Sequence, residues 1–350
     1  MRGKKLGSQT NRLLSKPSIK STGVVVGPKE GQGPLSQYFD EVSQDDLLGM
    51  PSWEQAESTY LYKACKKALG KAELTTSDID FFYSGDLLNQ TASSNLAAKK
   101  LGIPYFGLFG ACSTMTEGLI LASKAIDGGY ANNVMAATSS HNKGAERQFR
   151  FPTEYGGQRP PYAQWTVSGA GAAIISQEDV GPQISYVTTG KVLDWGISDA
   201  YDLGSAMAPA AYDTLKNHLE DTNQQVSDYD AIFTGDLGIQ GSSMFRELCE
   251  DDGIEVAMYH NDCGLLIYGS DQDVHGGASG CACSATVTYG YVLKLFEQNK
   301  LSRALIMATG ALHNPQIVQQ NVTIPTICHA VVLENISSSN NQNVGGDTSG

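Results

Sequence analysis

Short apolar runs alternate along this chain with longer segments in which apolar residues recur every three or four positions. The runs Ile79–Tyr83 and Val134–Thr138 predict buried strands. Between them, the spacing of apolar residues predicts helices over Asn95–Leu101 and Thr114–Ile126. Because parallel strands are joined by helices that cross over the sheet, this alternation favours an α/β fold with a parallel sheet.

The order of motifs in the first part of the chain recurs in the second part. Three pairs of strings match in the same order: 79–87 (IDFFYSGDL) with 229–237 (YDAIFTGDL), 110–113 (GACS) with 281–284 (CACS), and 137–142 (ATSSHN) with 308–314 (ATGALHN). The last match carries one inserted residue in the second copy. Three ordered matches at nearly constant spacing predict two copies of one α/β unit.

The repeat divides the chain into two halves, residues 19–183 and residues 184–336. Residues 1–18 read as a loose polar lead-in, and residues 337–350 as a low-complexity tail that is predicted to be disordered. The helices that begin near the second matched string are apolar on all sides in both copies, as expected of helices buried between sheets. The prediction is an internally duplicated αβαβα layered core.

Charge and hydropathy limit the possible functions. The net charge is −13, with 24 Lys and Arg against 37 Asp and Glu, which argues against a nucleic-acid-binding surface. Residues 1–20 are basic and polar but lack the apolar core of a secretory signal. No stretch reaches the roughly 18 apolar residues of a spanning helix, so any work at a membrane is expected to be peripheral.

The cysteines indicate buried, reduced thiols. There are seven, an odd number, and several lie inside apolar runs. Cys281 and Cys283 are one residue apart, which is not the spacing of a structural zinc site, so we expect neither a metal nor a cofactor. The sequence also lacks a P-loop, a His-Glu-x-x-His and a Gly-x-Ser-x-Gly motif.

Cys112 begins a predicted central helix. At such a position the helix dipole and the free N–H groups lower the pKa of a thiol and attract anions, which suits a nucleophile or the wall of a ligand pocket. The alternative is a buried structural thiol, because Cys283 occupies the equivalent turn without obvious chemistry. His141 and His313 end equivalent strands at the sheet edge where α/β folds bind ligands, and His141, which precedes an arginine-containing segment, is the preferred candidate.

The Gly-Ala-Cys-Ser turn of a duplicated α/β unit resembles the thiolase and ketoacyl-synthase superfamily. Residues 165–175 (WTVSGAGAAII) are similar to its Gly-rich strand, and the resemblance covers residues 20–335. Condensing enzymes of that superfamily carry His-Gln-Ala-Asn after the strand that here ends at Thr234, and an asparagine before the second central helix. This chain reads GDLG at 235–238, and residues 275–283 hold no equivalent asparagine. We therefore expect a thiolase-like fold that is not an enzyme.

Seven strings across the chain are similar to a narrower family, that of stage V sporulation protein AD from spore-forming bacteria. They are 26–30 (VGPKE), 85–90 (GDLLNQ), 139–142 (SSHN), 145–150 (AERQFR), 152–158 (PTEYGGQ), 204–211 (GSAMAPAA) and 260–265 (HNDCGL). This resemblance implies a protein that binds dipicolinic acid (pyridine-2,6-dicarboxylate), alone or as its calcium chelate, and supports its uptake into the developing spore.

The same resemblance implies partners and a location. The partners are membrane proteins of the same sporulation operon, and the location is peripheral, at the spore inner membrane or the forespore membrane. A homodimer formed through an edge strand is expected by analogy with the superfamily. The alternative function is a thioester-dependent acyltransferase or condensing enzyme that uses Cys112.

Arg147 and Arg150 are candidates for binding a planar dianion, because a guanidinium group offers paired donors to a carboxylate. They are three residues apart and share one face if residues 145–151 are helical. The alternative is a surface or interface pair bound to neighbouring glutamates. Tyr155 is a candidate for stacking on the pyridine ring, although an aromatic residue in such a loop is as often part of the core.

Asp194 is an acidic candidate on the connection between the two halves, followed by Asp199 and Asp202. Carboxylates suit a dianion only through a bridging calcium ion, or by orienting an arginine or a histidine. Asp86 and Asp236 recur through the duplication, which favours a structural role such as capping a helix.

Overall fold

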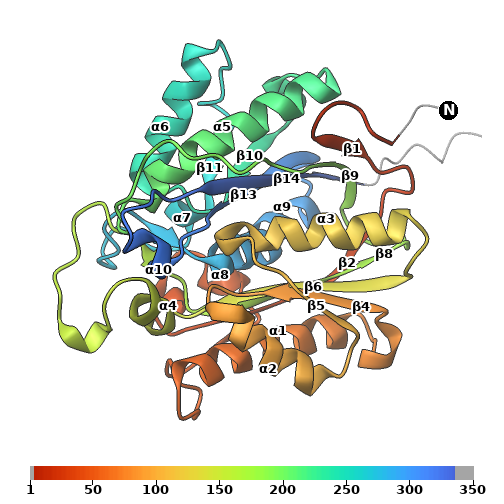
Figure 1. Cartoon of the computed structure of the whole chain (residues 1–350). Coiled ribbons are helices and arrows are strands. Elements are labelled where there is room, and N and C mark those ends of the chain that lie inside the picture. Colours follow the sequence, from red (N-terminus) through yellow and green to blue (C-terminus); the bar gives the residue numbers. More distant parts are fainter. Residues whose placement is uncertain (1–3, 336–350) are drawn as a thin grey trace, which may run out of the picture.

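The computed structural model describes residues 4–335 and has five layers (Figure 1). Two mostly parallel half-sheets are separated by central helices and covered by further helices on their outer faces. The predicted αβαβα core is therefore confirmed. The predicted elements are also present, since the first strand is displaced by only two residues and the others lie within observed strands and helices.

The first half-sheet has the order β2-β8-β6-β4-β5, and the second has the corresponding order β9-β14-β13-β10-β11. The first set is β2 (Ser18–Val26), β4 (Phe81–Gly85), β5 (Tyr105–Gly107), β6 (Asn133–Ser140) and β8 (Gly169–Ser176). The second set is β9 (Gln183–Thr188), β10 (Ala231–Thr234), β11 (His260–Asp262), β13 (Arg303–Ala311) and β14 (Thr326–Glu334). The matching strand orders show that the sequence repeat is a repeat of structure.

Helices fill the remaining three layers. The first half-sheet is covered on its outer face by α1 (Trp53–Lys71) and α2 (Ala92–Leu101), and the second by α5 (Leu203–Thr222) and α6 (Gly238–Asp251). The central layer holds α3 (Thr114–Asp127), α8 (Cys281–Thr286) and α9 (Leu293–Glu297). The short elements are β1 (Thr10–Arg12), β3 (Glu41–Val42), β7 (Trp165–Thr166), β12 (Ala278–Ser279), α4 (Asn142–Phe149), α7 (Cys263–Leu266) and α10 (Pro315–Val318).

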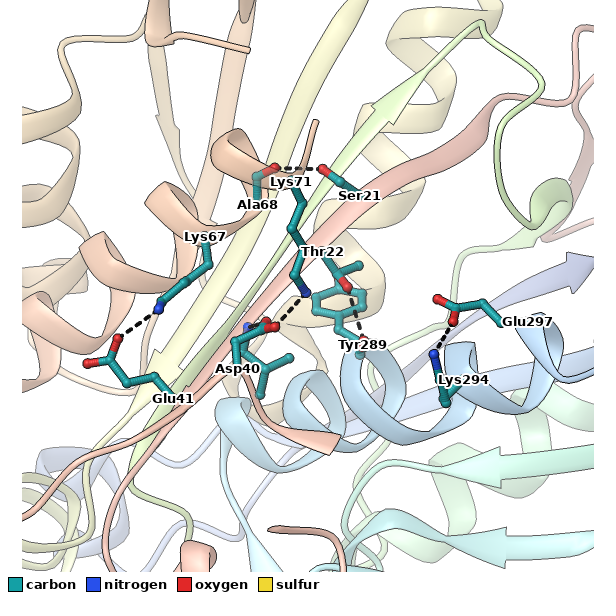
Figure 2. Close-up of polar contacts among 11 residues, drawn as sticks. Ser21, Thr22, Asp40, Glu41, Lys67, Ala68, Lys71, Tyr289, Lys294 and Glu297 are labelled. Carbon is teal, nitrogen blue, oxygen red and sulfur yellow. Dashed lines mark hydrogen bonds and ion pairs between the residues drawn. The ribbon is translucent and has the colours of Figure 1, made fainter. Parts of the chain in front are cut away.

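Strand β2 is held between two helical layers (Figure 2). The Ser21 hydroxyl donates to the carbonyl of Ala68 in α1, and the Thr22 hydroxyl donates to the carbonyl of Tyr289 at 3.0 Å. Tyr289 belongs to a π-helical stretch, Val287–Val292, that joins α8 to α9. Ion pairs tie Asp40 and the first residue of β3 to α1, namely Asp40–Lys71 and Glu41–Lys67. Glu41 also pairs with Lys63. Polar bonds on both faces of β2 therefore fix the first half-sheet between α1 and the central layer.

The N-terminal segment is more ordered than the sequence predicted. Residues Thr10–Arg12 form β1, which pairs antiparallel with β9, and Leu13 is buried in the central core. Three backbone N–H groups of this segment donate to the carboxylate of Asp221 at the end of α5. The predicted tail, 337–350, lies outside the described residues. Within residues 4–335, no helix has the length and apolarity needed to cross a membrane.

Candidate functional site

Cys112 lies in a tight turn between β5 and α3, near the centre of the molecule. Residues Ala111–Ser113 form one 3₁₀ turn, and Ala111 has a positive φ of 49°, a conformation that costs a non-glycine residue free energy. The Ser113 hydroxyl donates to the carbonyl of Gly110, and the Thr114 hydroxyl donates to the carbonyl of Ala111 at 2.7 Å. These short-range bonds hold the Cys112 turn in its strained form.

The equivalent turn of the second half meets the Cys112 turn. The thiol of Cys281 donates to the carbonyl of Ala111 at 3.0 Å, and the hydroxyl of Ser140 accepts the N–H of Ala282. Gly280 begins this second turn with φ 103°, which glycine adopts readily. The two central helices therefore start beside each other, as the duplication predicted.

Asp236 joins the two turns. Its carboxylate accepts the N–H of Gly280 and the hydroxyl of Thr309, both at 2.9 Å. Burial raises the pKa of Asp236 to about 7. Burial, followed by the charge of Asp236, raises the pKa of the Cys112 thiol well above its usual value. Of the two readings of Cys112, the direction of this shift is the one expected of a buried thiol, because burial favours the uncharged form.

A narrow pocket with about 30 Å³ of free space lies against Cys112, and we call it the inner pocket. This space holds roughly two water molecules, so a larger ligand enters only if the pocket walls move apart. Its walls are Leu87, Phe109, Ala111, Cys112, Ala145, Phe149, Arg150, Thr166, Leu203, Ser279, Ala311 and His313. The rings of Phe149 and His313 lie 5.2 Å apart. Burial, and then the charge of Arg150, lowers the pKa of His313 to about 4, so this ring is neutral at pH 7.

The two candidate arginines differ in burial and in their partners. Helix α4 ends at Phe149, and Arg150 has φ −134° and ψ −107°, which turns its side chain inward. The Arg150 side chain is only 4% exposed, and it donates to Glu146 at 2.7 Å and to the carbonyl of Ala200 at 3.0 Å. Arg147 is 49% exposed and pairs with Glu54 on α1. Residues 145–151 are therefore not one continuous helix, and the condition under which both arginines would share one face is not met.

The other predicted ligand residues lie away from the inner pocket. His141 caps the start of α4, and its ring contacts the carbonyl of Asp46 and the ring of Trp53. Tyr155 is 72% exposed and stacks on Phe151. Asp194 is exposed and accepts the hydroxyl of Thr323. Of the six candidates, the structure brings only Cys112 and Arg150 together.

His313 and Asp236 were not among the six ligand residues predicted from the sequence. The repeat already identified His313 as the equivalent of His141, but the neighbouring arginines favoured His141. The matched string in the second copy carries one inserted residue. Side chains alternate between the two sides of an extended chain, so one extra residue reverses the side on which the histidine lies. That insertion indicates that the two histidines differ in position, but both lie beyond the ends of their strands, so it does not by itself place His313 in the inner pocket.

The raised pKa of Asp236 predicts a dependence of stability on pH. The pKa of an unfolded aspartate is about 3.9, so between about pH 4 and pH 7 the folded state holds a proton that the unfolded state has lost. Its stabilising contribution is complete below pH 4 and is lost as the pH rises through about 7. We expect Asp236→Asn to reduce the fall in the free energy of unfolding between pH 5 and pH 8, by on the order of 2 kcal/mol.

Urea unfolding of the parent and the variant at both pH values measures this difference. Asp251→Asn, at an exposed position near the end of α6, is the control and is expected to leave the difference unchanged. If the free energy of unfolding falls between pH 5 and pH 8 as much in Asp236→Asn as in the parent, then Asp236 is already ionised in the folded protein at pH 5.

Comparison with known proteins agrees with this architecture. The 3-oxoacyl-[acyl-carrier-protein] synthase III of Aquifex aeolicus superposes with a TM-score of 0.53 at 15% identity, covering 91% of this chain and 99% of that chain. The E117Q variant of OleA from Xanthomonas campestris superposes with a TM-score of 0.59 at 13% identity, covering 93% and 99%. At such identities the likeness shows a thiolase-like fold and no shared activity.

The relationship in sequence is much closer to a sporulation protein. Stage V sporulation protein AD of Bacillus subtilis (strain 168) is 51% identical over 316 residues, which are 90% of this chain and 94% of that protein. The family described as Stage V sporulation protein AD (SpoVAD) matches residues 7–334. The chain therefore belongs to the stage V sporulation protein AD family.

Proposed function

We propose that this protein binds dipicolinate in the inner pocket and supports its uptake into the developing spore, as a binder and not as an enzyme. The observation that carries the proposal is the inward-facing guanidinium of Arg150 in an otherwise largely apolar pocket. A few well-placed polar groups among apolar walls are typical of small-molecule sites. The ligand itself comes from the resemblance to the sporulation family, and Arg150 supplies the chemistry for its carboxylate.

The geometry around Arg150 suits a planar anion. Its Nε and Nη1 atoms donate to Ala200 and Glu146, and Nη2 makes no hydrogen bond within residues 4–335. A free guanidinium N–H forms a charge-assisted bond to a carboxylate. The Phe149 and His313 rings offer faces for a pyridine ring, and neutral His313 adds an unpartnered Nδ1 atom in the described part of the chain.

The surroundings of Cys112 support binding over catalysis. A nucleophilic cysteine needs a lowered pKa or a nearby base, whereas burial and the Asp236 carboxyl favour the protonated thiol. The rival function, acyl transfer at Cys112, rests on two observations: the strained turn at Ala111 and the neutral His313 ring in the same pocket. A thiol with a strongly raised pKa makes this rival the weaker of the two.

The proposal includes partners and a location that follow from family membership alone. The protein would act at the forespore or spore inner membrane as a peripheral component, beside membrane proteins of its operon. It would exchange dipicolinate, alone or as the calcium chelate, with them. A homodimer through edge strand β5 belongs to the same proposal, and sedimentation analysis of the purified protein tests it.

Arg150→Met is expected to weaken dipicolinate binding by about ten- to a hundredfold, because it removes a charge-assisted bond and keeps an unbranched side chain of similar length. Isothermal titration calorimetry with the purified protein measures the dissociation constant. The matched control is Arg147→Met in the last turn of α4, which removes the same charge from an exposed position and is expected to bind like the parent.

Two results would contradict the proposal. One is the absence of saturable binding to the folded parent protein. The other is an equal loss of affinity in both arginine variants, which would mean that net charge and not the inner pocket governs binding. Thermal unfolding of each variant checks that the comparison is made on folded protein.

A further inference from the structure

A second cavity borders α4 next to the inner pocket, and we call it the outer pocket. It has a volume of about 100 Å³ and is lined by Asn142, Glu146, Phe151, Pro152, Thr153, Gly157, Arg159, Trp165 and Tyr201. Arg150 lies between the two cavities, because it lines the inner pocket while its guanidinium stacks on Tyr201 of the outer pocket at 5.1 Å. The neighbouring residues Trp165 and Thr166 of β7 likewise line different pockets.

Two buried donors in the outer pocket have no acceptor. Asn142 is 5% exposed, and within residues 4–335 its side-chain amide nitrogen has no hydrogen-bond partner. The Nη1 atom of Arg159 is likewise buried and without a partner in the described structure. Leaving a buried donor unsatisfied costs about 1–3 kcal/mol, so two of them beside one cavity indicate a missing acceptor.

The walls of the outer pocket indicate the chemistry of that acceptor. The Arg159 guanidinium stacks on Trp165 at 4.7 Å, so a cation and two aromatic rings, Trp165 and Tyr201, border the same space. Three cations, Arg150, Arg159 and Lys29, lie near two carboxylates, Glu146 and Asp273, and the Asp273 carboxylate is 80% exposed to solvent. The local charge is therefore positive in a chain of net charge −13. Amide and guanidinium donors beside aromatic faces suit a planar aromatic carboxylate.

We propose that the outer pocket is a second binding site for a planar aromatic carboxylate, whose carboxylate accepts from Asn142 and Arg159 and whose ring lies against Trp165 or Tyr201. The proposed function supplies only the identity of the ligand, since the site is argued from its own unpartnered donors. With Arg150 between the two pockets, the outer pocket forms an entry site from which a ligand passes to the inner pocket. Each chain then binds two molecules of dipicolinate.

Trp165 provides a direct probe of the outer pocket. The chain has three tryptophans, so Trp53→Phe/Trp195→Phe leaves Trp165 as the only indole. Titration of this variant with dipicolinate is expected to give a saturable change in Trp165 fluorescence. Adding Arg159→Gln or Asn142→Leu is expected to weaken that response about tenfold or more, through the loss of one hydrogen bond to the ligand. Arg147→Gln is the matched control and is expected to leave it unchanged.

Cys112→Leu separates the two proposals, because it narrows the inner pocket without touching the outer one. The Trp165 response is expected to persist in this variant, whereas calorimetry is expected to lose one of the two binding events. Binding that calorimetry detects with no change at Trp165, or a Trp165 response that survives both Arg159→Gln and Asn142→Leu, would overturn the outer pocket and leave the inner one intact. If Cys112→Leu keeps the Trp165 response and calorimetry still detects both binding events, the outer pocket is supported as a binding site and the inner pocket is not one.

Discussion

Gly310→Ala is expected to lower the free energy of unfolding by about 3 kcal/mol, the largest effect that we predict for a single methyl group. Gly310 lies in β13, directly against the Cys112 turn. A Cβ atom there would lie 2.2 Å from the carbonyl oxygen of Gly110 and 3.0 Å from the backbone nitrogen of Ser113. Both are backbone atoms of a strained turn, so no flexible side chain can move aside, and the turn itself must shift.

Urea unfolding followed by circular dichroism measures this loss. The control is Gly70→Ala near the end of α1, where a Cβ atom meets nothing within 4 Å. That substitution is expected to stabilise the protein by about 0.5 kcal/mol, because alanine loses less backbone entropy than glycine in a helix. A Gly310→Ala variant as stable as the parent would show that the Cys112 turn is not packed against β13 as described.

Cys112 is expected to react with iodoacetamide at least about a hundredfold more slowly than free cysteine near pH 7.5. The thiolate is the reactive form, and each unit by which the pKa rises lowers its population tenfold. Burial raises the pKa of Cys112 well above the usual value, and Asp236 adds to the shift. All seven cysteines are buried, so the native protein as a whole is expected to resist alkylation.

Intact-mass measurement after timed alkylation, with peptide mapping of the modified site, tests this expectation. Unfolded protein is the control and is expected to take up seven labels. Fast and selective labelling of Cys112 would instead favour the acyl-transfer function. In that case incubation with a panel of acyl-CoA donors would be expected to add an acyl mass at Cys112, which a pure binder does not acquire.

Much of the fold was predictable because its signals are local and linear. The spacing of apolar residues indicates a strand at Ile79–Tyr83 and a helix at Thr114–Ile126. The internal repeat is visible as matched strings at matched spacing. Two copies of one unit must bury equivalent faces against each other. For this reason the positions of Cys112 and Cys283 at the starts of two central helices followed from the sequence alone.

The contents of the candidate site were less predictable, because they depend on where individual side chains point. Arg150 lies one residue beyond the end of α4, and its side chain faces inward. Arg147 lies within α4 and pairs with Glu54 at the surface. His313 lies in the inner pocket, while its equivalent, His141, contacts Trp53 instead. The helical period of 3.6 and the strand period of 2 assign a side chain to a face only while the helix or strand is regular. Arg150 and His313 lie just beyond the ends of α4 and β13.

The sequence by itself determined the duplication, the layered α/β core and the place of Cys112 at the start of a central helix. The tertiary structure alone decided the surroundings of that cysteine, which raise the pKa of its thiol. The helix start favours a thiolate, whereas burial and the Asp236 carboxyl favour the neutral thiol. Asp236 and the core around Cys112 come from strands and helices far along the chain. Desolvation depends on everything packed around a group, so it can be judged only once the chain is folded.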